Sequence, residues 1–382
     1  MASTYVHFPF CKRKCIYCDF YSVTKTEDVE AFLGVLTREI TLAGDRHTDT
    51  AASTIFFGGG TPSLLEPSQL ERILSALRTA FQIALDAEVT LETNPGTVTQ
   101  EKLRAFRALG INRLSIGIQS FHDSELRTLG RVHDRTEALR CTRFALDAAF
   151  DNISFDLIYA IPGQTIASWE ETLRAAVELS PQHISAYSLT VENGTPLSRM
   201  VQAGEVRMNP ASLEVQMFEQ AQSFLGAHGY AQYEVSNYAL PGFRCRHNCN
   251  YWSHENYLGF GPSAHSFWKE TDGKRGRRWW NVADLATYVK RLKDGELPVE
   301  SEEHVGPHEL VDERIFLGLR SSGLNLARLR RDFGYDLMAH RGDVVRALID
   351  ERLAFLEGEA LRLTPRGYLV CDEICQRLLS SC

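Results

Sequence analysis

Apolar residues along the first two thirds of the chain follow two alternating patterns. Short apolar runs rich in β-branched and aromatic residues alternate with longer stretches in which apolar residues recur every three or four positions. The short runs predict six β-strands, at 4–7, 54–57, 88–93, 113–118, 152–158 and 183–189. Together the two patterns predict a chain of strand–helix units.

The stretches between the strands predict amphipathic helices. Their apolar faces are expected to consist of Val29, Phe32, Leu33, Leu36 and Ile40; Leu70, Ile73, Leu74, Leu77 and Phe81; Leu103 and Phe106; Leu139, Phe144 and Leu146; and Leu173, Ala176, Val177 and Leu179. A last helix is expected at 211–227. Six such units predict an α/β fold with a parallel sheet and right-handed crossovers, a partial (β/α)6 TIM-like barrel rather than a closed one.

The pattern changes near residue 302. Helices are expected at 308–319, 325–333, 341–353 and 365–379, with a hairpin strand at 358–364. This order predicts a small winged-helix-like α+β domain, so we divide the chain into 1–235, 236–300 and 301–382. Such a module can bind DNA, and Arg328, Arg330 and Arg331 fit that alternative, but we expect a cover or docking surface.

The overall composition narrows the class of protein. The chain has 382 residues, of which 44% are hydrophobic. Its net charge of −8 argues against a general nucleic-acid binder. We expect no transmembrane helix and no signal peptide. Nine cysteines fit a reducing cytoplasm. Four of them fall in or beside helical patterns and are expected to be small packed residues: Cys141, Cys371, Cys375 and Cys382.

Three cysteines stand within eight residues directly after the first strand. Cys11, Cys15 and Cys18 can turn their sulfurs toward one point. Three thiolates can hold three irons of a [4Fe-4S] cluster and leave the fourth iron open, since the usual cluster has four Cys ligands. A structural zinc site is the alternative, and it would need His7 as the fourth ligand.

The spacing Cys-x3-Cys-x2-Cys, with Tyr17 before the last Cys, resembles the cluster loop of the radical S-adenosylmethionine (SAM) enzymes. The wider stretch 5–20 is similar to the branch that contains oxygen-independent coproporphyrinogen III oxidase and its haem-chaperone relatives. The resemblance implies that the open iron binds SAM and that an electron from the cluster breaks a C–S bond to form a 5′-deoxyadenosyl radical.

Polar residues and glycines fall where the strands end, which is the reactive end of such barrels. Taken singly, each could be a cap, a tight turn or a surface group; together, carboxylates suit ribose hydroxyls and ammonium, and Arg suits a carboxylate. The resemblance carries the family's SAM contacts onto Tyr5, Gly59, Gly60, Thr61, Glu92, Gln119, Arg131 and Asp156.

A second motif, Cys245 to Trp252, places a histidine beside two aromatic residues. The residues alone fit an ordinary packed loop, and Cys245 and Cys249 leave open a second cluster or a zinc site. His-Asn-x-x-Tyr-Trp resembles the haem-binding signature of the haem-chaperone branch, which implies His247 as the iron ligand. His265 is the second choice.

A basic stretch from Lys269 to Arg278 follows. It is expected to be a solvated hairpin, or else Arg278 pairs with haem propionates, because Arg suits carboxylates.

The resemblance implies a haem chaperone that carries a [4Fe-4S] cluster and SAM and passes haem to a membrane or soluble acceptor. An electron donor and a homodimer are further expected partners. The alternatives are the oxidase, acting by radical decarboxylation, and a radical methyltransferase. Three features favour the chaperone: Phe20 stands where the oxidase has a further Cys, the stretch before the first strand is short, and the His247 motif is present.

Overall fold

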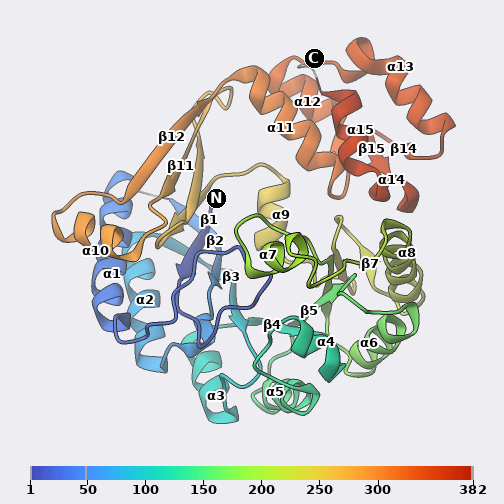
Figure 1. Cartoon of the computed structure of the whole chain (residues 1–382). Helices are drawn as coiled ribbons and strands as arrows, with labels where there is room; N and C mark the ends of the chain where they lie inside the picture. Colours follow the sequence, from blue (N-terminus) through green and yellow to red (C-terminus); the bar gives the residue numbers. More distant parts are fainter. Residues whose placement is uncertain (1, 48–49, 380–382) are drawn as a thin grey trace.

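The computed structural model describes residues 2–47 and 50–379. Six parallel strands in sequence order form its centre, and helices follow them along the chain on the outside of the sheet (Figure 1). These strands are β1 (Ala2–Phe8), β2 (Ala51–Gly59), β3 (Gln82–Thr93), β4 (Arg113–Gln119), β5 (Ile153–Tyr159) and β6 (His183–Ser188). The structure confirms the predicted α/β arrangement, with strand bounds that differ by a few residues.

Most of the outer helices bury one apolar face against the sheet. The outer helices are α1 (Val29–Arg46), α2 (Pro67–Ala80), α3 (Gln100–Leu109), α4 (Asp123–Thr128), α5 (Arg135–Asp147), α6 (Ile166–Glu178), α7 (Pro196–Gln202) and α8 (Ala211–Ala227), with a 3-10 turn at Pro62–Leu64. Of these, α7 packs instead beside the end of β5 and the loop of Cys11 to Cys18. The predicted face of α5 is wrong, because Leu139 and Leu146 are exposed. Its buried side consists of Ala138, Cys141, Thr142 and Ala145, which follow the i, i+3, i+4, i+7 spacing of one helical face.

The sheet extends beyond the six expected strands on both sides. Its order is β12-β11-β10-β9-β1-β2-β3-β4-β5-β6-β8-β7, so the ends do not meet and the barrel is open. The added elements are β7 (Ala231–Gln232), β8 (Asn237–Ala239), α9 (Arg246–Trp252), β9 (Tyr257–Phe260), β10 (His265–Lys269), β11 (Gly276–Asn281), α10 (Leu285–Lys293) and β12 (Val299–Val305). Prediction missed β8, which lies in a stretch interpreted as loop, and it took the His247 motif for a loop rather than helix α9.

The C-terminal module packs around a hydrophobic core of its own and lies above the barrel (Figure 1). It contains α11 (Pro307–Leu319), β13 (Leu324–Asn325), α12 (Leu326–Phe333), α13 (Leu337–Asp350), β14 (Ala354–Glu357), β15 (Ala360–Leu363), α14 (Pro365–Leu369) and α15 (Cys371–Leu378). Its sheet has the order β13-β15-β14. The expected final helix is broken near Val370, whose φ of −119° and ψ of 28° leave the helical region. Cys371 and Cys375 are buried as predicted; Cys382 lies outside the described residues.

Polar contacts fasten this module to the turn that follows α9. Arg328 Nη2 forms an ion pair with Glu255 Oε1 at 2.8 Å, and His254 Nε2, whose pKa burial lowers, lies 2.9 Å from Glu313 Oε2. Arg314 also donates a hydrogen bond to the Ser253 carbonyl. The module is therefore attached directly beside the helix that carries the His247 motif.

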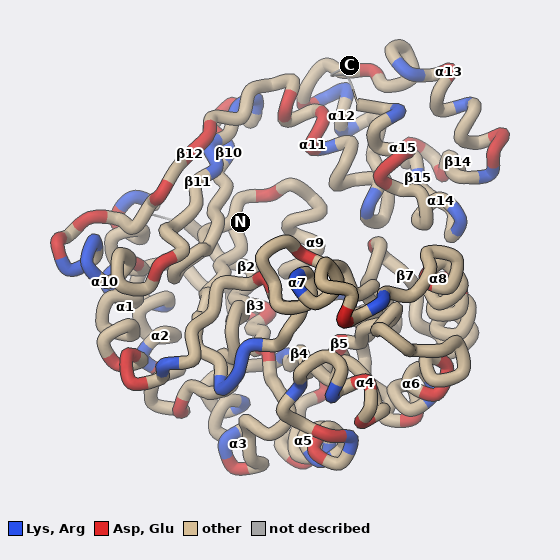
Figure 2. Tube along the Cα trace, viewed as in Figure 1, with Lys and Arg blue, Asp and Glu red and all other residues tan. Residues whose placement is uncertain are grey.

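The three arginines that fit the DNA-binding alternative, Arg328, Arg330 and Arg331, are paired with carboxylates. Arg328 contacts Glu255 and Asp332, whereas Arg330 contacts Asp336 and Glu359. Arg331 also pairs with Asp332. Figure 2 shows basic and acidic residues interspersed along this module. This neutralised surface does not favour the DNA-binding alternative. Within the described part of the chain, no helix has the length and apolar character needed to cross a membrane.

Candidate functional site

Cys11, Cys15 and Cys18 lie in an irregular loop after β1 and line one cavity of about 160 Å³. All three thiols are free of disulfides. Thr61 Oγ1 donates a hydrogen bond to Cys11 Sγ at 3.5 Å, and Arg131 Nη1 donates to Cys15 Sγ at 3.6 Å. Hydrogen bonds of this kind stabilise a thiolate, so the loop is suited to anionic sulfur ligands.

The predicted rim residues converge on the same cavity. Its lining includes Gly59, Gly60, Thr61, Glu92, Gln119, Arg131 and Asp156 beside the three cysteines. Tyr5 and His247 line a neighbouring cavity described below. The structure thus brings together side chains from five strands and the loops that follow them.

Glycine is required at positions 59 and 60 for a steric reason that was not predicted from the sequence. Gly59 has a φ of +104°, and a Cβ there would lie 2.6 Å from the His7 ring. A Cβ on Gly60 would lie 2.8 Å from the Phe10 carbonyl oxygen. These glycines let the end of β2 pack against the Cys loop. This packing role does not exclude a ligand on the open side of the same glycines.

Two buried carboxyl groups face the cavity. Burial, together with the neighbouring Asp156, raises the pKa of Glu92 to about 8. Burial also raises the pKa of Asp156 to about 6, although Ser115 Oγ donates a hydrogen bond to it at 3.0 Å. Carboxyl groups with this shift ionise more readily when a cation occupies the cavity.

Arg131 joins the Cys loop to two strand ends. Beside Cys15, its guanidinium donates to the Gly117 carbonyl at 2.8 Å and to Asn94 Oδ1. Asn94 in turn donates to Thr61 Oγ1 at 3.1 Å. Asn94 was not predicted as a site residue, and its position directly after β3 is the signal that could have identified it.

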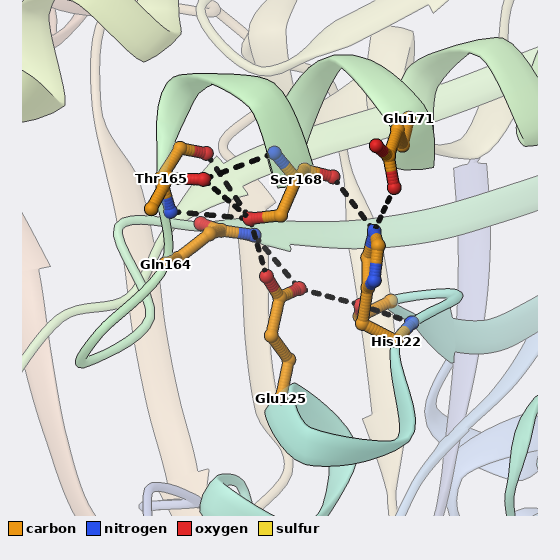
Figure 3. Close-up of polar contacts among 7 residues, drawn as sticks. His122, Glu125, Gln164, Thr165, Ser168 and Glu171 are labelled. Carbon is orange, nitrogen blue, oxygen red and sulfur yellow. Dashed lines mark hydrogen bonds and ion pairs between the residues drawn. The ribbon is translucent and has the colours of Figure 1, made fainter.

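Gln119 ends β4 with a φ of +67°, and its side chain accepts a hydrogen bond from Tyr187 at 3.1 Å. The loop behind it is held by Glu125, a buried carboxylate in α4. Glu125 accepts hydrogen bonds from Ser120 Oγ at 2.6 Å, from Gln164 Nε2 at 3.0 Å and from Ser168 Oγ at 2.8 Å (Figure 3). Through this network, the segment that follows Gln119 is anchored to the start of α6.

The structure disfavours the zinc alternative at the Cys loop. His7 Nε2 lies 2.8 Å from the Tyr21 carbonyl and Nδ1 lies 3.2 Å from Tyr5 Oη, so both ring nitrogens have protein partners. Within residues 2–47 and 50–379, no three His, Cys, Asp or Glu side chains form a group that could hold a single metal ion. His7 also does not line the cavity that the three cysteines share, so it does not complete a four-ligand site with them.

A second cavity of about 680 Å³ continues from the first. The two share Tyr17, Cys18, Phe20, Gly59, Glu92, Ser115, Asp156 and Tyr187. Its remaining wall includes Tyr5, Arg113, His247, Asn248, Tyr251, Trp252 and Arg320. The Cys loop, through Tyr17, Cys18 and Phe20, and the His247 motif, more than 200 residues later, therefore both line the second cavity.

His247 is 1% exposed, and both its ring nitrogens have partners. Nδ1 lies 2.8 Å from Thr54 Oγ1, and Nε2 lies 3.1 Å from Tyr251 Oη. Burial and the Arg113 cation lower the pKa of His247 to about 3, so the ring is neutral. A neutral imidazole is the form that ligates iron, but Nε2 must first separate from Tyr251.

The other residues considered around this motif do not meet in the cavity. Cys245 contacts Glu88 at 3.5 Å, and neither Cys245 nor Cys249 lines either space. His265 is exposed on β10 and stacks on Trp280. Arg278 lies in the hairpin of β10 and β11 and pairs with Glu303 of β12 and Glu313 of α11.

Comparison with known proteins agrees with this architecture. Residues 5–176 match the radical SAM superfamily, and residues 305–370 match the HemN C-terminal domain. The heme chaperone HemW of Bacillus subtilis is 34% identical over 98% of both chains. HemW of Mycobacterium tuberculosis strain H37Rv is 36% identical over 98% of this chain and 94% of that protein.

The solved structure of coproporphyrinogen III oxidase (HemN) from Escherichia coli has the same fold. It superimposes with a TM-score of 0.85 over 100% of this chain and 90% of that chain, at 22% identity. The sequence relatives extend over nearly the full length and combine both matched regions. This chain therefore belongs to the HemW family of radical SAM proteins.

Proposed function

We propose that this protein is a haem chaperone that binds haem in the second cavity and transfers it to an acceptor protein, while the first cavity holds a [4Fe-4S] cluster and SAM. The observation that supports this most strongly is the continuity of the two cavities through Tyr17, Glu92, Asp156 and Tyr187. A ligand beside His247 would adjoin one beside the Cys loop.

In this proposal Cys11, Cys15 and Cys18 hold the cluster. The loop fits the group, because three free thiols line one cavity and two of them accept hydrogen bonds from the protein. When bound, the cluster supplies electrons at an iron that the protein leaves open. The protein's part is to hold the sulfurs, to shield them from solvent and to keep a binding space beside them.

The residues around that space suit SAM, whose sulfonium and ammonium groups outweigh its one carboxylate. Glu92 and Asp156 offer two carboxylates, and Gln119 and Thr61 offer neutral hydrogen-bonding groups. Tyr5, on β1, lines the second cavity rather than the first. Burial raises the pKa of both carboxyls, and a bound cation would favour their ionised forms.

SAM affinity is expected to rise as pH increases from 6 to 7.5. Below the raised pKa of about 8, Glu92 is largely protonated and must release its proton to pair with a cation. Linkage of one proton gives at most about a tenfold gain per pH unit. Above this range the ammonium of SAM itself begins to lose its proton. Calorimetry at several pH values measures the slope; Glu92→Gln is the control and should flatten it. A wild-type affinity that is independent of pH would refute the charge assignment.

For haem, the proposal assigns His247 as ligand after its separation from Tyr251. His247→Ala is expected to weaken haem binding and to leave the cluster in place, because His247 does not line the first cavity. Tyr251→Phe should tighten haem binding, since it removes the hydroxyl that competes for Nε2. Optical titration with haem measures both changes. Unchanged affinity in His247→Ala, with a loss in His265→Ala, would transfer the ligand role to His265.

The proposed division of labour follows the chain: residues 1–235 for cluster and SAM, 236–300 for haem, and 301–382 as a cover. Arg320, at the end of α11, lines the second cavity, so the C-terminal module takes part in closing it. The proposal also includes two partners, an electron donor and a haem acceptor, as well as a homodimer and a location in a reducing cytoplasm.

The decisive experiment is anaerobic. The cluster is reconstituted, haem is titrated while the visible spectrum is recorded, and the same sample is assayed with coproporphyrinogen III, SAM and a reductant. A saturable haem spectrum without decarboxylation supports the chaperone. Turnover to protoporphyrinogen without stable haem binding would show an oxidase that lacks the extra Cys at Phe20.

A further inference from the structure

Arg113 is the most deeply buried cation of the second cavity. It begins β4, is 2% exposed and lines the cavity wall. Among the described residues, its side chain makes no hydrogen bond or ion pair, and its buried Nε has no partner. Nearby acidic groups raise the pKa of Arg113 despite its burial, so it is held as a cation whose hydrogen-bond donors are unused.

Arg131, at the first cavity, differs from Arg113 in its hydrogen bonds. It is half-buried, and its terminal nitrogens donate to Asn94, Gly117 and Cys15. Two carboxyl groups, Glu88 and Asp156, lie in the field of Arg113 without a hydrogen bond to it. Asp156 accepts a hydrogen bond from Ser115, and both Glu88 oxygens accept backbone N–H groups of Arg246 and His247 at 3.0 Å. Glu88 is thus committed to the start of α9.

Further polar atoms around the same cavity lack partners. Trp252 Nε1 and Asn237 Oδ1 are buried, line the cavity and have no hydrogen bond. The cavity therefore presents an unpaired cation with unpaired polar groups, together with the aromatic side chains of Tyr5, Phe56, Tyr187, Tyr251 and Trp252. Flat apolar faces beside a guanidinium suit an aromatic ligand that carries a carboxylate.

We infer that Arg113 forms a carboxylate-binding subsite in the second cavity and anchors one carboxylate side chain of the tetrapyrrole. The inference rests on the proposed haem site and adds to it the group that orients the ring. It also replaces the sequence-based hypothesis for Arg278, whose guanidinium is occupied by Glu303 and Glu313 and which does not line this cavity.

The test compares ligands with and without free carboxylates. Haem and its dimethyl ester are titrated into wild type and Arg113→Gln. The variant should lose about 10- to 100-fold in affinity for haem, as expected for a hydrogen bond to a charged group, and little for the ester. Arg278→Gln is the matched control and should bind both ligands as wild type does. Thermal melts and the ester affinity report whether Arg113→Gln is folded.

Metal-free protoporphyrin and its dimethyl ester repeat the comparison without iron ligation. If wild type prefers the free acid and Arg113→Gln does not, the subsite is supported even where His247 proves not to be a ligand. The inference is overturned if Arg113→Gln keeps the preference for free carboxylates, or if it loses SAM affinity while haem binding stays unchanged. Wild type without preference for free acid over ester in either series also overturns it.

Discussion

Cys15→Ala is expected to leave the reconstituted protein without a [4Fe-4S] cluster. Cys15 lies between the other two thiols in the loop, and two sulfurs are too few to hold the cluster. Its sulfur also accepts the hydrogen bond from Arg131, so the substitution removes an anchor of the loop. Iron and sulfide analysis with the visible spectrum measures the loss.

The control for Cys15→Ala is Cys249→Ala, which removes a half-buried thiol on α9 that does not line either cavity. This variant should retain a normal cluster content. An intact iron–sulfur spectrum in Cys15→Ala would refute the cluster assignment, and equal losses in both variants would point to a general effect on folding.

Arg131→Glu is expected to have the second largest effect, on cluster and SAM together. The change removes three hydrogen bonds, to Cys15, Asn94 and Gly117, and places a carboxylate beside the thiolates. Loss of a partner that orients a metal ligand typically costs 10–100-fold in metal affinity, and the added repulsion increases this. SAM affinity should fall as well, because Arg131 lines the same cavity.

The control is Arg127→Glu, which makes the same charge change on the exposed side of α4. It should leave both cluster content and SAM affinity unchanged. Calorimetry with SAM and iron analysis distinguish the two variants. Equal SAM affinity in wild type and Arg131→Glu would exclude a role for Arg131 in this site.

The parts predicted best from sequence depend on local patterns. The six parallel strands and most helices follow from apolar spacing, which reports which face of each element is buried. The family resemblance supplied the rim residues, and the position of most of them at or after strand ends agrees with it, because parallel strands bring these ends to one edge. Where local spacing was misread, as at Leu139 and Leu146 of α5, the predicted face was wrong.

Arg113 was not predicted as a site residue, although the alternation of residues along β4 indicates its position. Along β4, Arg113, Ser115, Gly117 and Gln119 alternate, and alternate residues of a strand share one face. Gln119 was assigned to the cavity, so the same periodicity would have placed Arg113 on the inner face. No local sequence pattern shows that Arg113 lacks a hydrogen-bond partner there.

The sequence by itself determined the cysteine spacing, the positions of the six parallel strands and the resemblance of the His247 motif, since each depends on residues close in the chain. Only the tertiary structure decided how distant groups combine. It placed Thr54 and Tyr251 on the two nitrogens of His247, paired Arg278 with Glu303 and Glu313, and joined the two cavities. The physical reason is that a side chain's partners are set by packing between elements: Thr54 and His247 are 193 residues apart, and no local spacing reports their contact.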